Sequence, residues 1–163
     1  YEDLAEKPLF YNDREAKQVS RLHELITEEK YKEVCDRMKK AGMRTGVTCL
    51  FYGAPGTGKT ETVYQLARQT GRYIMEVNVD KIKDRFVGES EKNMRSVFET
   101  YRKKVRSMKN APILLFNEAD AIFSKRITNV DHSVDQMNNA IQNIILQEME
   151  KLKRQKFLRI PLI

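Results

Sequence analysis

The stretch Gly53-Ala54-Pro55-Gly56-Thr57-Gly58-Lys59-Thr60 decides the fold, because it matches the pattern G-x-x-x-x-G-K-[ST] in full. The run Val47–Tyr52 before it is apolar, aromatic and β-branched, which predicts a strand buried on both faces. After it we expect a helix from Lys59 to Thr70, and Gly71 is placed to end that helix. A strand, a glycine-rich turn and a helix in this order predict a phosphate-binding loop.

Each residue type in the loop has a chemical purpose. Glycines let the backbone curl until successive N–H groups point inward and form a nest for anions. The helix that begins near Lys59 adds free N–H groups and the positive end of its dipole. Lys59 contributes a full charge for the β and γ phosphates, and the Thr60 hydroxyl is a hard oxygen ligand for Mg²⁺. We therefore expect Gly53 to Thr60, together with Glu61, to bind ATP with Mg²⁺.

Strands and helices alternate along the chain. Further strands are expected at Tyr73–Asn78 and Ile113–Phe116, and residues 124–135 are expected to form a polar loop. One helix is expected to begin at Asp13 and a second at Glu28, after Thr27 as its cap. A third is expected to follow Ser90 as its cap, and a fourth to contain the apolar positions from Met137 to Leu152. This order predicts an α/β P-loop NTPase fold, a parallel sheet with helices on both faces. In such sheets ligands bind beyond the carboxyl ends of the strands.

Polar residues follow the strand Ile113–Phe116, beginning with Asn117 and Glu118. A P-loop ATPase needs a carboxylate at such a strand end to hold the water shell of Mg²⁺. Here Asn117 stands first, and its amide oxygen can accept a hydrogen bond from a bound water but brings no charge. Glu118 remains to polarise the attacking water, so Glu118 and Lys59 are the candidate catalytic residues. The alternative for Glu118 is an ordinary polar residue at a strand end.

Composition narrows the class of protein. The chain has 163 residues, of which 40% are hydrophobic and 33% charged, as in one globular domain. No apolar run approaches the roughly 20 residues needed to span a bilayer, and no signal peptide opens the chain. Cys35 and Cys49 lack metal-type spacing, so we expect a cytoplasmic protein with free thiols. The net charge of +7 is scattered among glutamates, which makes nucleic acid an unlikely partner.

Four blocks of sequence resemble the AAA+ family, and within it the AAA branch. Gly53–Thr60 resembles that branch's GPPGTGKT, and Arg85–Asn93 resembles its GESEKN box. Phe116–Asp120 corresponds to its Walker B end, and Gln142–Met149 is similar to its VNQLLQEMD helix. The resemblance covers about residues 45–152 in the family's order. The FNEAD form of the Walker B end is also similar to that of a bacterial group of AAA ATPases.

The resemblance implies a hexameric ring that uses ATP to pull protein substrates through a central pore. It places Phe86, with Val87 and Gly88, at the pore-loop position, where an aromatic side chain grips an extended chain. It matches Asn78 to a polar residue that holds the catalytic glutamate in check. The alternatives are a core phenylalanine for Phe86 and a strand-end hydrogen-bonding residue for Asn78.

The same resemblance divides the chain into three parts. Residues 1–44 are expected to be a helical extension, residues 45–152 the ATPase core, and residues 153–163 a tail of uncertain assignment. The family's second sensing asparagine, arginine fingers and helical lid are not found after Leu152. The chain is therefore interpreted as a truncated large subdomain without its lid.

Three functions are consistent with these residues. The first is ATP hydrolysis coupled to protein remodelling. The second is a nucleotide-gated scaffold that binds ATP and hydrolyses it poorly, which Asn117 keeps open. The third is a DNA-associated ATPase of the clamp-loader kind, which an aromatic residue in the pore-loop block disfavours.

Overall fold

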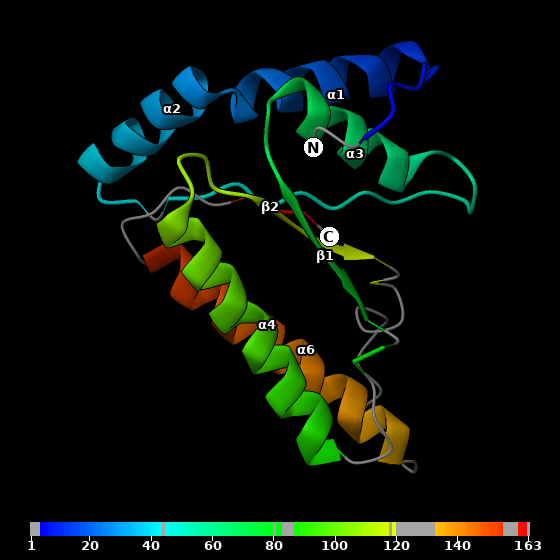
Figure 1. Cartoon of the computed structure of the whole chain (residues 1–163), viewed down its shortest axis with the longest axis vertical. Coiled ribbons are helices and arrows are strands. Elements are labelled where there is room, and N and C mark those ends of the chain that lie inside the picture. The colour runs from blue at the N-terminus through cyan, green and yellow to red at the C-terminus, as the bar shows by residue number, and fades with distance from the viewer. Residues whose placement is uncertain are drawn as a thin grey trace.

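The computed structural model describes residues 4–43, 45–79, 81–82, 87–117, 119, 133–154 and 160–162. Within these residues, helices lie on both sides of a small sheet (Figure 1). In chain order the elements are α1 (Asp13–Ile26), α2 (Glu28–Lys40), α3 (Lys59–Gln69), β1 (Ile74–Asn78), α4 (Val87–Ser107), β2 (Ile113–Asn117), α6 (Ser133–Arg154) and β3 (Ile160–Leu162).

The sheet is parallel throughout, with the strand order β1-β2-β3. β1 pairs with β2 from Ile74 opposite Ile113 to Asn78 opposite Asn117. This confirms the two strands predicted in this part of the chain. β3 pairs with β2 on its other side, so part of the tail left without an assignment belongs to the sheet. All three strands run the same way, and their carboxyl ends therefore meet at one edge.

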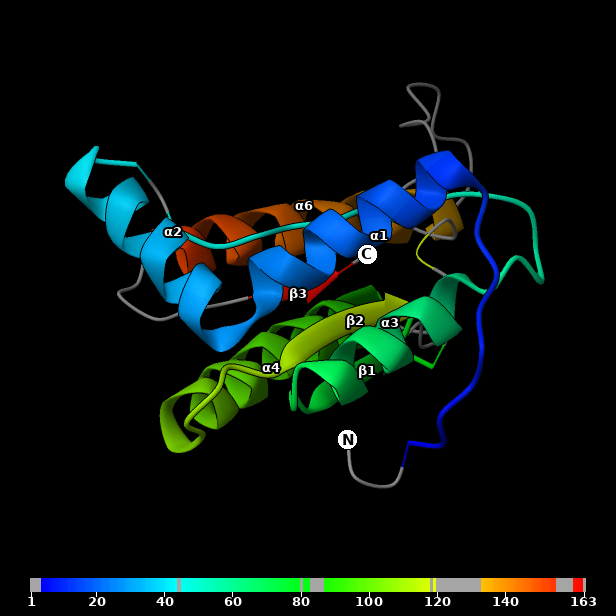
Figure 2. The same ribbon diagram turned by 90° about the horizontal axis from the view of Figure 1, so that it is seen from above.

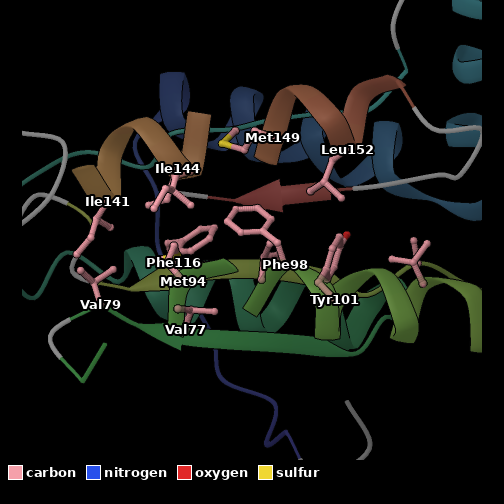
Figure 3. Close-up of a cluster of buried hydrophobic side chains, with 14 residues drawn as sticks. Val77, Val79, Met94, Phe98, Tyr101, Phe116, Ile141, Ile144, Met149 and Leu152 are labelled. Carbon is pink, nitrogen blue, oxygen red and sulfur yellow. The ribbon is translucent and has the colours of Figure 1, made fainter. Parts of the chain in front are cut away.

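One face of the sheet packs against α4 and α6. The core there combines Val77 of β1, Leu114 and Phe116 of β2, and apolar side chains of both helices (Figure 3). The rings of Phe98 and Phe116 lie 5.8 Å apart between centroids, tilted by 36°. The helical residues are spaced three and four apart along each helix, as predicted: Met94, Phe98, Tyr101, Val105, Ile141, Ile144, Ile145, Met149 and Leu152.

The opposite face packs against α1, α2 and α3 (Figures 1 and 2). Ile113 and Leu115 of β2 point to this side and contact a cluster that includes Ile26, Tyr31 and Leu66. Successive residues of a strand point to opposite faces, so β2 is buried on both sides. The predicted α/β architecture, with helices on both faces of a parallel sheet, is confirmed.

Gly71 ends α3, as expected. Its φ is +61°, a conformation that costs glycine little and other residues more. The turn lets the N–H of Arg72 donate to the carbonyl of Ala67 at 2.9 Å, which satisfies a carbonyl at the helix end. The chain then reverses and enters β1.

Three local predictions are wrong. Residues 133–135, expected to belong to the polar loop 124–135, already form the first turn of α6. Val47–Tyr52 is not a strand buried on both faces: only Cys49 makes a β-bridge, and Leu50 and Tyr52 are 67% and 83% exposed. Cys49 and Phe51 do pack against the α1–α3 cluster, so one face of this segment is covered and the other is not. Ser90 does not cap α4, because the helix already begins at Val87 and Ser90 lies buried inside it.

A buried carboxylate ties α4 to α6. Glu148 of α6 is only 2% exposed and forms ion pairs with Arg102 of α4 and, at 2.6 Å, with Lys151. Burial raises the pKa of Glu148, but the hydrogen bonds from Arg102 and Lys151 outweigh burial and leave the pKa below its ordinary value. The ion pairs therefore stabilise the folded state while Glu148 is ionised.

Glu148→Gln should lower the free energy of unfolding at pH 7 by about 1.5–3 kcal/mol, because the charged hydrogen bonds are lost. The folded pKa lies below the unfolded value, so this stability is present above the unfolded pKa and disappears as the pH falls through the folded pKa. Urea unfolding at several pH values checks this. The difference between variant and wild type should shrink below about pH 4.5, whereas exposed Glu99→Gln should differ little from wild type at any pH.

Candidate functional site

The glycine-rich loop lies directly before α3. Gly58 is the N-cap residue of α3 with φ +81°, a left-handed conformation that suits glycine. The Lys59 ammonium folds back over the loop and donates to the carbonyls of Gly53 and Ala54, both at 2.9 Å. The Thr57 hydroxyl also donates to the Ala54 carbonyl, at 2.8 Å. The loop thus combines a lysine charge with the N terminus of a helix, and both attract anions.

A chain of hydrogen bonds joins this loop to the sheet. The Thr60 hydroxyl donates to Asn117 Oδ1 at 3.3 Å, and Asn117 Nδ2 donates to Glu76 Oε1 at 3.2 Å. Tyr64 OH donates to the other oxygen of Glu76 at 2.7 Å. Burial, with the Glu76 carboxylate beside it, raises the pKa of Tyr64 to about 12, so this donor stays protonated at neutral pH.

A cavity of about 590 Å³ opens beside the loop. Its wall comes from the segment before α1, the face of α1, residues 49–53 and the loop itself. Tyr11 closes one side, where its hydroxyl lies 3.0 Å from Thr62 Oγ1 of α3. Aromatic and aliphatic side chains at this cavity are exposed, most of all Phe10 at 94%. A cavity of this size, partly apolar and next to an anion site, suits a flat heterocycle joined to phosphates.

The N-terminal segment lies along α3. Gln65 Nε2 donates to the Ala5 carbonyl at 2.9 Å, and Lys7 pairs with Glu61 at 2.9 Å. The hydrogen bonds from Lys7 and Gln65 lower the pKa of Glu61. Glu61, expected to bind nucleotide, is therefore already engaged by its neighbours, and its role stays a prediction.

The other expected site residues fall into two groups. Asn78 lies opposite Asn117 at the carboxyl end of β1, and its Oδ1 accepts from the Lys81 N–H at 3.4 Å. Val87 and Gly88 form the first turn of α4. Glu118 and Phe86 lie outside the described residues. Their predicted roles stay predictions.

Sequence reasoning missed Glu76 and Tyr64. The available signal was the strand Ile74–Asn78 itself, in which Glu76 is the one charged residue. A carboxylate in a short apolar strand needs a partner or solvent, and this one has both. Its partner on β2, Asn117, is set by the register of the two strands, and the sequence of β1 alone does not reveal that register.

The donor set suits Mg²⁺ with a nucleotide. Mg²⁺ usually keeps several waters and takes one or two protein oxygens plus phosphate oxygens. Thr60 Oγ1 and Asn117 Oδ1, 3.3 Å apart, are two such hard oxygens beside the loop. In the part of the chain that the structure describes, no three His, Cys, Asp or Glu side chains gather as a metal cage. Two neutral protein oxygens beside an anion site therefore fit a cation that also takes oxygens from phosphate.

A parallel sheet whose strand ends meet a glycine loop at a helix N terminus defines a P-loop nucleotide-binding domain. The chain belongs to the ATPase family associated with various cellular activities (AAA), whose model matches residues 49–161. This confirms the AAA resemblance and an ATP-binding function of the AAA type, while the FNEAD bacterial group stays a prediction.

One curated relative covers a smaller part of the chain. It is Protein SAV of Sulfolobus acidocaldarius, 42% identical over 78 residues, which are 47% of this chain and 9% of that protein. The chain thus spans less than a tenth of this relative's length. None of the described helices is long and apolar enough to cross a membrane.

Lys59→Ala should weaken ATP binding by roughly 10-fold or more, because a charge-assisted bond to phosphate is worth about 1.5–3 kcal/mol. Calorimetric titration with ATP and Mg²⁺ measures the affinity. Lys103→Ala, which removes an exposed lysine of α4, is the matched control and should bind as wild type does. Equal affinity of Lys59→Ala and wild type, with both folded, would contradict this assignment.

Proposed function

We propose that the chain is the ATP-hydrolysing core of an AAA-type machine that couples hydrolysis to protein remodelling. The observation that carries this proposal is the Thr60–Asn117 hydrogen bond, which joins the phosphate loop to the end of β2. It brings a hydroxyl and an amide oxygen together where a metal–phosphate group can bind. The alternative is the nucleotide-gated scaffold, which would bind ATP through the same residues and hydrolyse it poorly.

The polyphosphate would bind the loop from Gly53 to Thr60, with Lys59 leaving its two carbonyl partners for the β and γ phosphates. Thr60 would coordinate the cation directly and Asn117 through water. When bound, Mg²⁺ supplies positive charge that stabilises the phosphoryl oxygens. The adenine would enter the cavity beside Tyr11 and Tyr52, where aromatic faces can stack on it.

Glu118 directly follows Asn117 at the end of β2, and we propose that it orients the attacking water. An arginine from a neighbouring subunit would complete the site in a homo-oligomer, by resemblance a hexamer; such fingers typically raise the rate by about 10³–10⁵. Asn78, which ends β1 next to Asn117, would restrain Glu118 between cycles. We also propose a cytoplasmic location, in keeping with the free thiols of Cys35 and Cys49.

Glu118→Gln should retain ATP and lose turnover by about 10²-fold or more, because removing a general base commonly costs that much. Steady-state ATPase rate and ATP affinity, measured on the full-length protein, separate the two steps. Exposed Glu99→Gln is the matched control and should keep both values. A wild type that binds ATP tightly without detectable turnover would favour the scaffold instead.

Protein remodelling requires a grip on the substrate, and we propose Phe86, with Val87 and Gly88, as that grip. Phe86→Ala should abolish stimulation of the ATPase by a permanently unfolded polypeptide and leave the melting midpoint close to wild type. Phe98→Ala provides the contrast, since Phe98 is fully buried and its truncation should cost about 3–5 kcal/mol. A loss of stability by Phe86→Ala as large as that of Phe98→Ala would assign Phe86 to the core.

A further inference from the structure

The carboxylate of Glu76 is hydrogen-bonded to the strand-end amide of the proposed metal site. Glu76 lies on β1 and Asn117 on β2, 41 residues apart in the chain, and the parallel pairing of the two strands brings them together. Asn117 Nδ2 donates to Glu76 Oε1 at 3.2 Å. Tyr64 of α3 donates to Glu76 Oε2 at 2.7 Å, so both oxygens of the carboxylate have a partner.

This arrangement determines which way the Asn117 amide points. An ionised carboxylate accepts hydrogen bonds and donates none, so the NH₂ group of Asn117 must face Glu76. The carbonyl oxygen Oδ1 is then directed to Thr60, 3.3 Å away. By holding the NH₂ group, Glu76 makes Asn117 present its acceptor oxygen, rather than its NH₂ group, toward a cation beside Thr60.

The electrostatics of the proposed cation site also involve Glu76. Thr60 and Asn117 are both neutral, whereas a P-loop site usually has a carboxylate at the end of the strand. The Glu76 carboxylate lies one amide group away from Thr60 along the hydrogen-bonded chain. Its attraction for a cation acts through that short distance, although the exposure of Glu76 to solvent screens it in part.

We propose that Glu76 is a positioning residue of the magnesium site, one that orients Asn117 and supplies from β1 the negative charge that the strand-end amide lacks. This inference rests on the proposed function, because it assumes that MgATP binds at Thr60. It assigns to Glu76 of β1 the negative charge that position 117 of β2 lacks.

The same geometry explains why an acid at position 117 would not improve this site. Asn117→Asp replaces the donor NH₂ by a carboxylate oxygen about 3 Å from a Glu76 oxygen, and like charges so close repel each other. The repulsion is relieved when Glu76→Gln is made as well, since the glutamine amide can donate to the new aspartate. Moving the single negative charge from position 76 to position 117 should therefore be tolerated. A negative charge at both positions should destabilise the site.

Four proteins test the proposal: wild type, Glu76→Gln, Asn117→Asp and the double variant, with exposed Glu24→Gln as the control. The first readout is the Mg²⁺-dependent gain in affinity, the ratio of the dissociation constants for a non-hydrolysable ATP analogue in EDTA and in Mg²⁺. The second readout is the melting midpoint of each protein without metal or nucleotide. Neither depends on turnover.

Glu76→Gln should lower the Mg²⁺-dependent gain by about 10-fold, the lower end of the 10–100-fold typical for an outer partner of a metal ligand. Asn117→Asp should lower the melting midpoint, and the double variant should recover both the midpoint and the gain. An unchanged gain in Glu76→Gln, or an Asn117→Asp variant that gains affinity without help from the second change, would overturn the role of Glu76. A wild type without any Mg²⁺-dependent gain would overturn the proposed function, and the role of Glu76 with it.

Discussion

The parallel pairing of β1 with β2 is the constraint on which the site depends. Its register sets Asn78 opposite Asn117 and brings Glu76 within hydrogen-bonding distance of Asn117. A strand alternates its side chains with period two, so a shift by one residue would turn Asn117 toward α4 and α6. Phe116 would then face the phosphate loop. That shift would bury the Asn117 amide among the apolar side chains of α4 and α6, and burying an unpaired polar group is costly.

The position of the phosphate loop also depends on packing outside the loop. The loop consists mainly of small residues and has little apolar surface of its own. It is placed by α3, whose Val63, Leu66 and Ala67 pack in the cluster that covers Ile113 and Leu115 of β2. Helix and strand therefore share one core, and the Thr60 hydroxyl reaches Asn117 because both elements are fixed to it.

The N-terminal helices are attached to this core through a buried arginine. Arg72 is 2% exposed, and its guanidinium donates to the carbonyls of Ile26 and Ala111 at 2.9 and 2.8 Å. It also lies over the Tyr31 ring, 5.3 Å from the centroid. A buried cation is costly unless its donors are satisfied, and these partners come from the end of α1, from α2 and from the segment before β2. Residues that precede the stretch matched by the AAA family model, 49–161, thus share the interior of the fold.

The sequence by itself determined the phosphate loop, the alternation of strands and helices, the apolar faces of α4 and α6, and the AAA family, since each depends on residues close together in the chain. Only the tertiary structure decided that Val47–Tyr52 leaves one face exposed and that Ile160–Leu162 completes the sheet. It also decided that Glu76 faces Asn117. The physical reason is register: a hydrogen bond between two side chains 41 residues apart depends on how their strands are aligned in the sheet, and no local pattern records that.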